Sequence, residues 1–114
     1  MYPPTKKDLI AINREIGETG AFGNESSFDF ALSLLKQKKP WLQELAYIVR
    51  SLLVDHAFQD GNKRTALSLI MGFCEYHRIE YDRQKMVYIT HQIAKKNWKD
   101  INKIVRLMEN GIVR

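Results

Sequence analysis

The residues best suited to chemistry stand in one short polar segment of the sequence, residues 54–67, which reads Val-Asp-His-Ala-Phe-Gln-Asp-Gly-Asn-Lys-Arg-Thr-Ala-Leu. His56 carries an imidazole that can take a proton from an attacking hydroxyl group near neutral pH. Asp60 can hold a Mg²⁺ ion that bridges phosphates. A helix cap is the alternative role for this aspartate, because Asp is common at that position.

A glycine and three polar residues follow directly. Gly61 permits a sharp turn and a close approach of the backbone to a ligand. Asn62 is predicted to open a helix, whose first N–H groups and positive dipole end favour phosphate. Lys63 and Arg64 lie in the first turn, where the helix dipole disfavours cations unless an anion lies between them. The segment therefore predicts a site for attack on a nucleotide phosphate.

This string resembles the signature of the Fic/Doc family, written H-x-F-x-[D/E]-[A/G]-N-[K/G]-R, at every fixed position. The resemblance implies an α-helical Fic fold and an enzyme that transfers part of ATP, or of another nucleotide, to a hydroxyl group on a target protein. It implies that His56 is the general base and that Asp60 binds Mg²⁺. It implies that four residues at the helix start bind phosphate: Gly61, Asn62, Lys63 and Arg64.

A second segment, residues 17–26, is rich in glycine and polar residues and is predicted to be a loop or a short hairpin. The resemblance implies that residues 20–25 form a flap that docks the target protein, for which a translation factor is one candidate. The flap residues expected to matter are Gly20, Phe22, Gly23 and Asn24.

Two departures from the family pattern bear on the group that is transferred. AMP-transferring members usually have glycine where this chain has Lys63 and a second arginine where it has Leu67. A lysine in that slot is similar to the Doc branch, whose toxin members transfer a phosphoryl group. Doc-type sequences often carry alanine at the position of Gly61, so adenylyl transfer stays open as the alternative.

The resemblance also bears on regulation. Many relatives carry an inhibitory helix with the pattern [S/T]-x-x-x-E-[G/N]. Glu109 and Asn110 match its end, but Val105 replaces the Ser or Thr. Inhibition by a separate antitoxin chain is therefore the expectation.

The first half of the chain contains several helix signals. Thr5, followed three residues later by an aspartate, is typical of a helix start, and Gly17 of a helix stop. Ser26 or Ser27 is predicted to cap a second helix. Pro40 suits the first turn of a third.

The second half predicts three more helices. The segment 62–77 is apolar around most of its girth, which predicts a central, buried helix. Asp82 is expected to cap a fifth helix, and Asn110-Gly111 to end a sixth. We therefore expect an all-α fold of about six helices with a short flap, in one domain spanning residues 1–114.

Composition narrows the class of protein. The chain has 114 residues and a single cysteine, so an internal disulfide is excluded. The first eight residues have no apolar core typical of a secretory signal, and no apolar run approaches the ~20 residues of a membrane span. We expect a cytoplasmic protein without membrane contact.

The net charge of +5 leaves a basic nucleic-acid-binding regulator as an alternative class. Nucleic acid is not the expected partner, because Lys63 and Arg64 open the most apolar predicted helix, which is poorly suited to reading a groove. The basic residues near Lys95 are expected to be solvated helix faces. A catalytically dead binding module is the other alternative, against which the intact motif argues.

Four other residues have side chains capable of chemistry. His77 and His91 have no acidic or cysteine neighbours at metal-ligand spacing, so both are predicted to be structural. Cys74 falls on an apolar helix face and is predicted to be a core residue. Asp55 precedes His56 and could orient the loop.

Overall fold

The computed structural model describes residues 3–113, so the ends of the predicted domain 1–114 lie outside the described residues. Six α-helices and one 3₁₀ helix account for most of these residues, and the only β structure among them is two isolated bridges. The all-α fold is confirmed. The helices are α1 (Lys6–Glu15), α2 (Glu25–Ser33), η1 (Leu34–Gln37), α3 (Trp41–Leu53), α4 (Asn62–Tyr76), α5 (Arg83–Lys96) and α6 (Ile101–Asn110).

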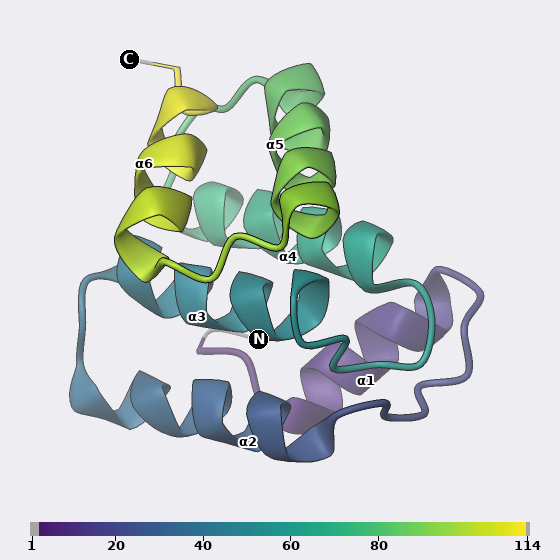
Figure 1. Ribbon diagram of the computed structural model, residues 1–114. Coiled ribbons are helices and arrows are strands. Elements are labelled where there is room, and N and C mark those ends of the chain that lie inside the picture. Colours follow the sequence, from purple (N-terminus) through teal and green to yellow (C-terminus); the bar gives the residue numbers. More distant parts are fainter. Residues whose placement is uncertain (1–2, 114) are drawn as a thin grey trace.

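Helix α3 lies at the centre of the molecule, between α2 on one side and α5 and α6 on the other (Figure 1). Eight of its 13 residues are buried, against six of the 15 residues of α4. The prediction that the 62–77 helix is the central one is therefore wrong. Helix α4 packs on α3, and Leu67 and Met71 remain half-buried because no element fully covers that side.

Polar side chains set most helix starts. Thr5 and Asp8 form the predicted capping box of α1, and the side chain of Asp82 caps α5 as expected. The predicted serine cap of α2 is wrong, because the Asn24 side chain accepts a hydrogen bond from the Ser27 backbone N–H instead. Pro40 is the N-cap residue of α3 and so lies one position before the predicted first turn.

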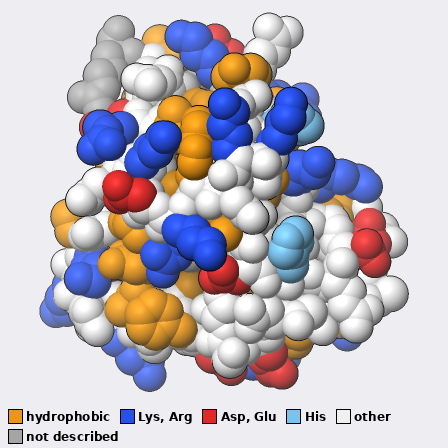
Figure 2. All heavy atoms as spheres, viewed as in Figure 1, with side chains coloured by type: hydrophobic (Ala, Val, Ile, Leu, Met, Phe, Trp, Pro, Cys, Tyr) orange, Lys and Arg blue, Asp and Glu red, His pale blue; other side chains and the backbone are white. Residues whose placement is uncertain are grey.

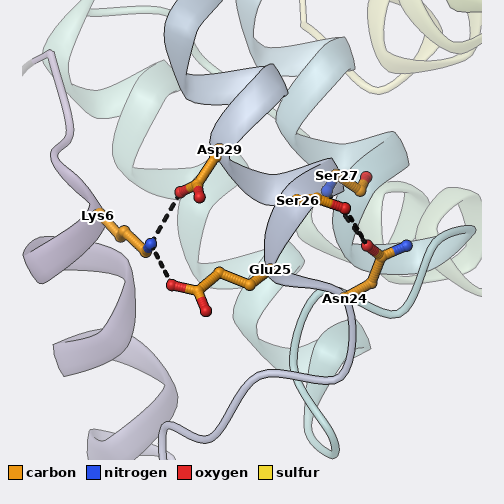
Figure 3. A network of polar contacts seen from close by, with 6 residues as sticks. All are labelled: Lys6, Asn24, Glu25, Ser26, Ser27 and Asp29. Atoms are coloured by element: carbon orange, nitrogen blue, oxygen red, sulfur yellow. Dashed lines mark hydrogen bonds and ion pairs between the residues drawn. The ribbon is translucent and has the colours of Figure 1, made fainter.

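The first turns of α1 and α2 are tied together at the surface. Lys6 forms ion pairs with Glu25 and with Asp29, the latter at 2.8 Å (Figure 3). Hydrogen bonds to Asp29 and then Glu25 raise the pKa of the Lys6 ammonium. The Lys6 ammonium also lies 5.0 Å from the ring centroid of Phe22, in the segment between the two helices.

The segment between α1 and α2 does not fold back on itself as a hairpin. Phe22 instead forms an isolated antiparallel bridge with Phe58, in the loop between α3 and α4. Their rings stack with centroids 5.2 Å apart, and both rings contact Phe28 of α2 at 5.5 Å. The flap and the polar loop are therefore one packed unit.

None of the helices within residues 3–113 has the length and apolar character that crossing a bilayer requires.

Candidate active site

The loop between α3 and α4 is held by its own hydrogen bonds. The Ala57 N–H donates to the Ser51 carbonyl at 3.0 Å, which turns the chain directly after α3. The Asn62 side chain accepts from the Phe58 N–H at 3.0 Å and donates to the Phe58 carbonyl at 2.9 Å. Phe58 is fully buried. The loop is thus anchored at both ends.

His56 lies at the exposed turn of this loop, with a left-handed backbone conformation (φ 54°). This conformation is unfavourable for a residue with a Cβ atom, and Lys38, Arg78 and Asn97 adopt it at the ends of other helices. The neighbouring residue is fixed from α2, because the Ser27 hydroxyl donates to an Asp55 carboxylate oxygen at 2.6 Å. That contact supplies the physical basis for the suggested orienting role of Asp55.

Helix α4 begins without a capping side chain. Its N-cap is Gly61, whose φ of +76° favours glycine, and no side chain accepts a hydrogen bond from the first turn. The alternative role of Asp60 as the cap is therefore not found. The first hydrogen bond inside the helix is from the Thr65 N–H to the Gly61 carbonyl, so the amides of the preceding turn have no partner within the helix. These amides are suited to an anion.

A cavity of about 500 Å³ opens beside His56 and is called the His56 cavity below. Its volume is within the range of small-molecule sites in proteins. The polar loop and the start of α4 supply six of its lining residues: His56, Gln59, Asp60, Gly61, Asn62 and Lys63. The rest of the lining comes from α3 and α5: Leu53, His91, Ala94 and Lys95.

Two predicted phosphate ligands lie differently from expectation. Arg64 is not among the residues that line the His56 cavity, and its guanidinium donates to the Ile16 carbonyl at 2.8 Å. The Asn62 side chain is used by Phe58, which leaves the backbone N–H of Asn62 as its group for an anion. Lys63 is the one motif cation that both is exposed and lines the cavity.

The four predicted flap residues are not part of the cavity lining. The Gly23 and Asn24 N–H groups both donate to the Ala57 carbonyl, at 2.9 and 3.1 Å. Phe22 packs on Phe58, and the Gly20 N–H donates to the Asn13 side chain at 2.9 Å. The flap therefore supports the back of the loop that carries His56.

One residue that the sequence reasoning missed ties these parts together. Asn13 of α1 is 1% exposed. Its side-chain nitrogen donates to the Asp60 carbonyl at 3.0 Å and to the Thr65 hydroxyl at 3.1 Å, and its oxygen accepts from the Gly20 N–H. The sequence did carry a signal for this role, because Asn13 is a polar residue four positions after Leu9, on the buried face of a predicted helix.

His91, predicted to be structural, is exposed and lines the His56 cavity. The other predicted structural residues have the expected surroundings. His77 stacks on Trp41 with ring centroids 4.5 Å apart, and burial lowers the pKa of its imidazole. Cys74 is 1% exposed, and burial raises the pKa of its thiol to about 11.

The donors in the cavity fit a magnesium ion that arrives with a nucleotide. Among residues 3–113 no three His, Cys, Asp or Glu side chains are grouped as a metal cage. Asp60 is exposed in the cavity as a single carboxylate. Magnesium is commonly held in that way, by one or two carboxylates together with water and substrate phosphates.

Comparison with known proteins identifies the family of the chain. The model of the Fic/DOC family matches residues 3–74, from before α1 to near the end of α4, which is more than half of the chain. No match was found among curated proteins. The chain belongs to the Fic/DOC family, whose members are in general nucleotide-using transferases.

Proposed function

We propose that the chain transfers the γ-phosphoryl group of ATP to a hydroxyl group on a target protein, as a Doc-like member of its family, and that residues 1–114 form one catalytic domain. The observation that carries the proposal is the lining of one cavity by an exposed imidazole, a carboxylate and an uncapped helix start. Each element of a phosphoryl-transfer site has a counterpart there.

In the proposed reaction, the imidazole of His56 takes the proton of the target hydroxyl as its oxygen attacks the γ-phosphorus. The bond from that phosphorus to the β–γ bridging oxygen breaks, and ADP leaves with the electron pair. The amides of Gly61, Asn62 and Lys63, with the Lys63 ammonium, stabilise the negative charge on the phosphate oxygens. Asp60 would hold Mg²⁺, which neutralises phosphate charge when bound.

Support for phosphoryl rather than adenylyl transfer comes from the cations around α4. Lys63 occupies the slot that is glycine in AMP-transferring members, and Leu67 is an apolar, half-buried residue where they have a second arginine.

The test is transfer of label from ATP to protein. The full chain is incubated in a cell lysate with Mg²⁺ and either γ-labelled or α-labelled ATP. We expect the γ-label alone to reach a protein band, and His56→Ala to lower the rate ~10²–10⁴-fold. Transfer of the α-label would identify an adenylyltransferase instead. Transfer of neither label, or full transfer by His56→Ala, would refute the proposal.

We further propose that inhibition comes from a separate antitoxin chain, as for a cytoplasmic toxin. Support comes from α6, because Glu109 lines a different cavity together with Lys103 and Arg106. Co-expression with the product of a neighbouring small gene should relieve toxicity and give a co-purifying complex. Growth arrest that persists on co-expression, with no complex, would count against this partner.

A further inference from the structure

The wall of the His56 cavity formed by α5 lies outside the residues matched by the family model, which end at Cys74. It contains His91, Ala94 and Lys95. His91 and Lys95 are four residues apart, so they lie on the same face of the helix, and both are exposed. The family motif therefore assigns no role to two polar side chains in the lining of the proposed nucleotide site.

The proposed ligand is an anion, so cations in the α5 wall would help to bind it. A bound Mg²⁺ would neutralise only part of the negative charge of the ATP triphosphate, and Lys63 is the only cation that the loop and α4 contribute to the lining. Arg64 binds a backbone carbonyl instead. Lys95 is the other cation among the described lining residues. In Figure 2, lysine and arginine side chains outnumber acidic ones over the α5 and α6 side of the visible face.

The C-terminal end of a helix is by itself a favourable place for lysine, because the helix dipole is negative at that end. This explanation applies equally to Lys95 and Lys96, which both lie in the last turn of α5. Only Lys95 lines the His56 cavity, whereas the Lys96 ammonium lies 5.7 Å from the ring centroid of Trp98. The two lysines thus separate a helix-end role from a cavity role.

We infer that Lys95, with His91 one turn before it, forms a second phosphate-binding wall of the site, supplied by α5 rather than by the loop and α4. The inference rests on the proposed function for the identity of the ligand. Lys95 supplies a charge-assisted hydrogen bond to a phosphate oxygen, and His91 donates a ring N–H beside it.

Binding is measured by calorimetry with three probes: ATP with Mg²⁺, inorganic tripolyphosphate, and adenosine. The proteins are wild type, Lys95→Gln, His91→Gln, Lys63→Gln and the control Lys96→Gln, each checked for folding by thermal unfolding. Lys95→Gln and Lys96→Gln change the net charge and the helix end in the same way.

Lys95→Gln should lower the affinity for ATP and for tripolyphosphate by about 10- to 100-fold, as expected for a lost hydrogen bond to a charged group. His91→Gln should lower both affinities by about 2- to 10-fold, and Lys96→Gln should lower them by less than about twofold. Adenosine binding should be the same in all of them.

Equal affinities of Lys95→Gln and Lys96→Gln for tripolyphosphate would overturn the inference. If Lys63→Gln weakens ATP in that case, the proposed function survives and only the α5 wall fails. The converse is also distinguishable. Should Lys95→Gln lose ATP affinity while no label is transferred to protein, the phosphate wall stands and the proposed transfer fails.

Discussion

At the scale of single residues, His56 combines exposure with an unfavourable backbone conformation. Its φ of 54° is fixed by hydrogen bonds on both sides, from Ser27 to Asp55 and from Ala57 to the Ser51 carbonyl. The fold therefore holds the imidazole at the turn of the loop, over the cavity, at a cost in backbone energy. The same turn lets the Ala57 N–H bind the Ser51 carbonyl in the last turn of α3, and it leaves the exposed imidazole in the cavity lining.

The strain at His56 can be measured with a pair of substitutions. A left-handed conformation costs a residue with a Cβ atom about 1–2 kcal/mol, whereas glycine adopts it freely but loses more entropy on folding. We expect His56→Gly to be about 1 kcal/mol more stable to urea unfolding than His56→Ala.

The matched control is Gln59, an exposed residue of the same loop whose φ is not positive. There the order should reverse, with alanine the more stable variant. Equal stability of the two His56 variants would contradict the strained conformation.

Asn13 allows a second residue-scale prediction. Its side chain serves the Gly20 N–H, the Asp60 carbonyl and the Thr65 hydroxyl, in a buried position. Asn13→Ala leaves these groups without their partner and should lower the free energy of unfolding by about 2–4 kcal/mol. The exposed Asn102→Ala should change it by less than about 0.5 kcal/mol. A comparable effect of the two variants in urea titrations would remove Asn13 from the support of the site.

At the scale of elements, the flap and the loop between α3 and α4 act as one unit. The Gly23 and Asn24 amides bind the Ala57 carbonyl, and Phe22 stacks on Phe58. The ion pairs of Lys6 with α2 close the same assembly at the surface. The position of His56 therefore depends on a segment that is more than 30 residues earlier in the sequence.

Gly23→Ala tests this dependence. A Cβ atom at Gly23 would lie 2.8 Å from the His56 carbonyl oxygen and 3.1 Å from that of Phe58, so the backbone of one segment must move. We expect a loss of about 1–3 kcal/mol in stability together with a clear fall in label transfer. Gly17→Ala is the control, because it strains a positive φ but meets no atom within 4 Å. Equal transfer rates for the two variants would show that flap docking does not position His56.

At the scale of the whole molecule, helix boundaries were the most predictable feature. Thr5 and Asp82 cap their helices because a side-chain oxygen next to free amides is a local interaction that sequence shows directly. The central position of α3 was not predictable, because it depends on which helices pack around α3 and which leave one side of α4 uncovered. The apolar girth of a helix gives no information about its neighbours.

The candidate site divides in the same way. The loop side of the cavity could be predicted, since His56 to Lys63 are contiguous in the chain. The α5 side could not, because only tertiary packing brings Lys95 to the same cavity. The direction of Arg64 was also unpredictable, since its partner is a backbone carbonyl, which every residue carries.

The partly buried ring of His77 couples global stability to pH. Burial lowers the pKa of its imidazole from the usual 6.5, so the unfolded chain binds more protons once the pH falls below that value. Its contribution to stability is complete above pH 6.5 and is lost as the pH drops toward the folded pKa. His77→Phe keeps a ring against Trp41 but does not titrate. Its urea midpoint should fall less steeply than that of wild type between about pH 7 and 5. Identical slopes would contradict this coupling.

The central claim is that one triphosphate binds in the His56 cavity. A crystal structure of the full chain with Mg²⁺ and a non-hydrolysable ATP analogue tests it most directly. We predict the phosphates at the start of α4, Mg²⁺ on Asp60, and the γ-phosphorus as the phosphorus nearest to the His56 imidazole. A triphosphate bound outside this cavity, or an imidazole turned away from every phosphorus, would contradict the account.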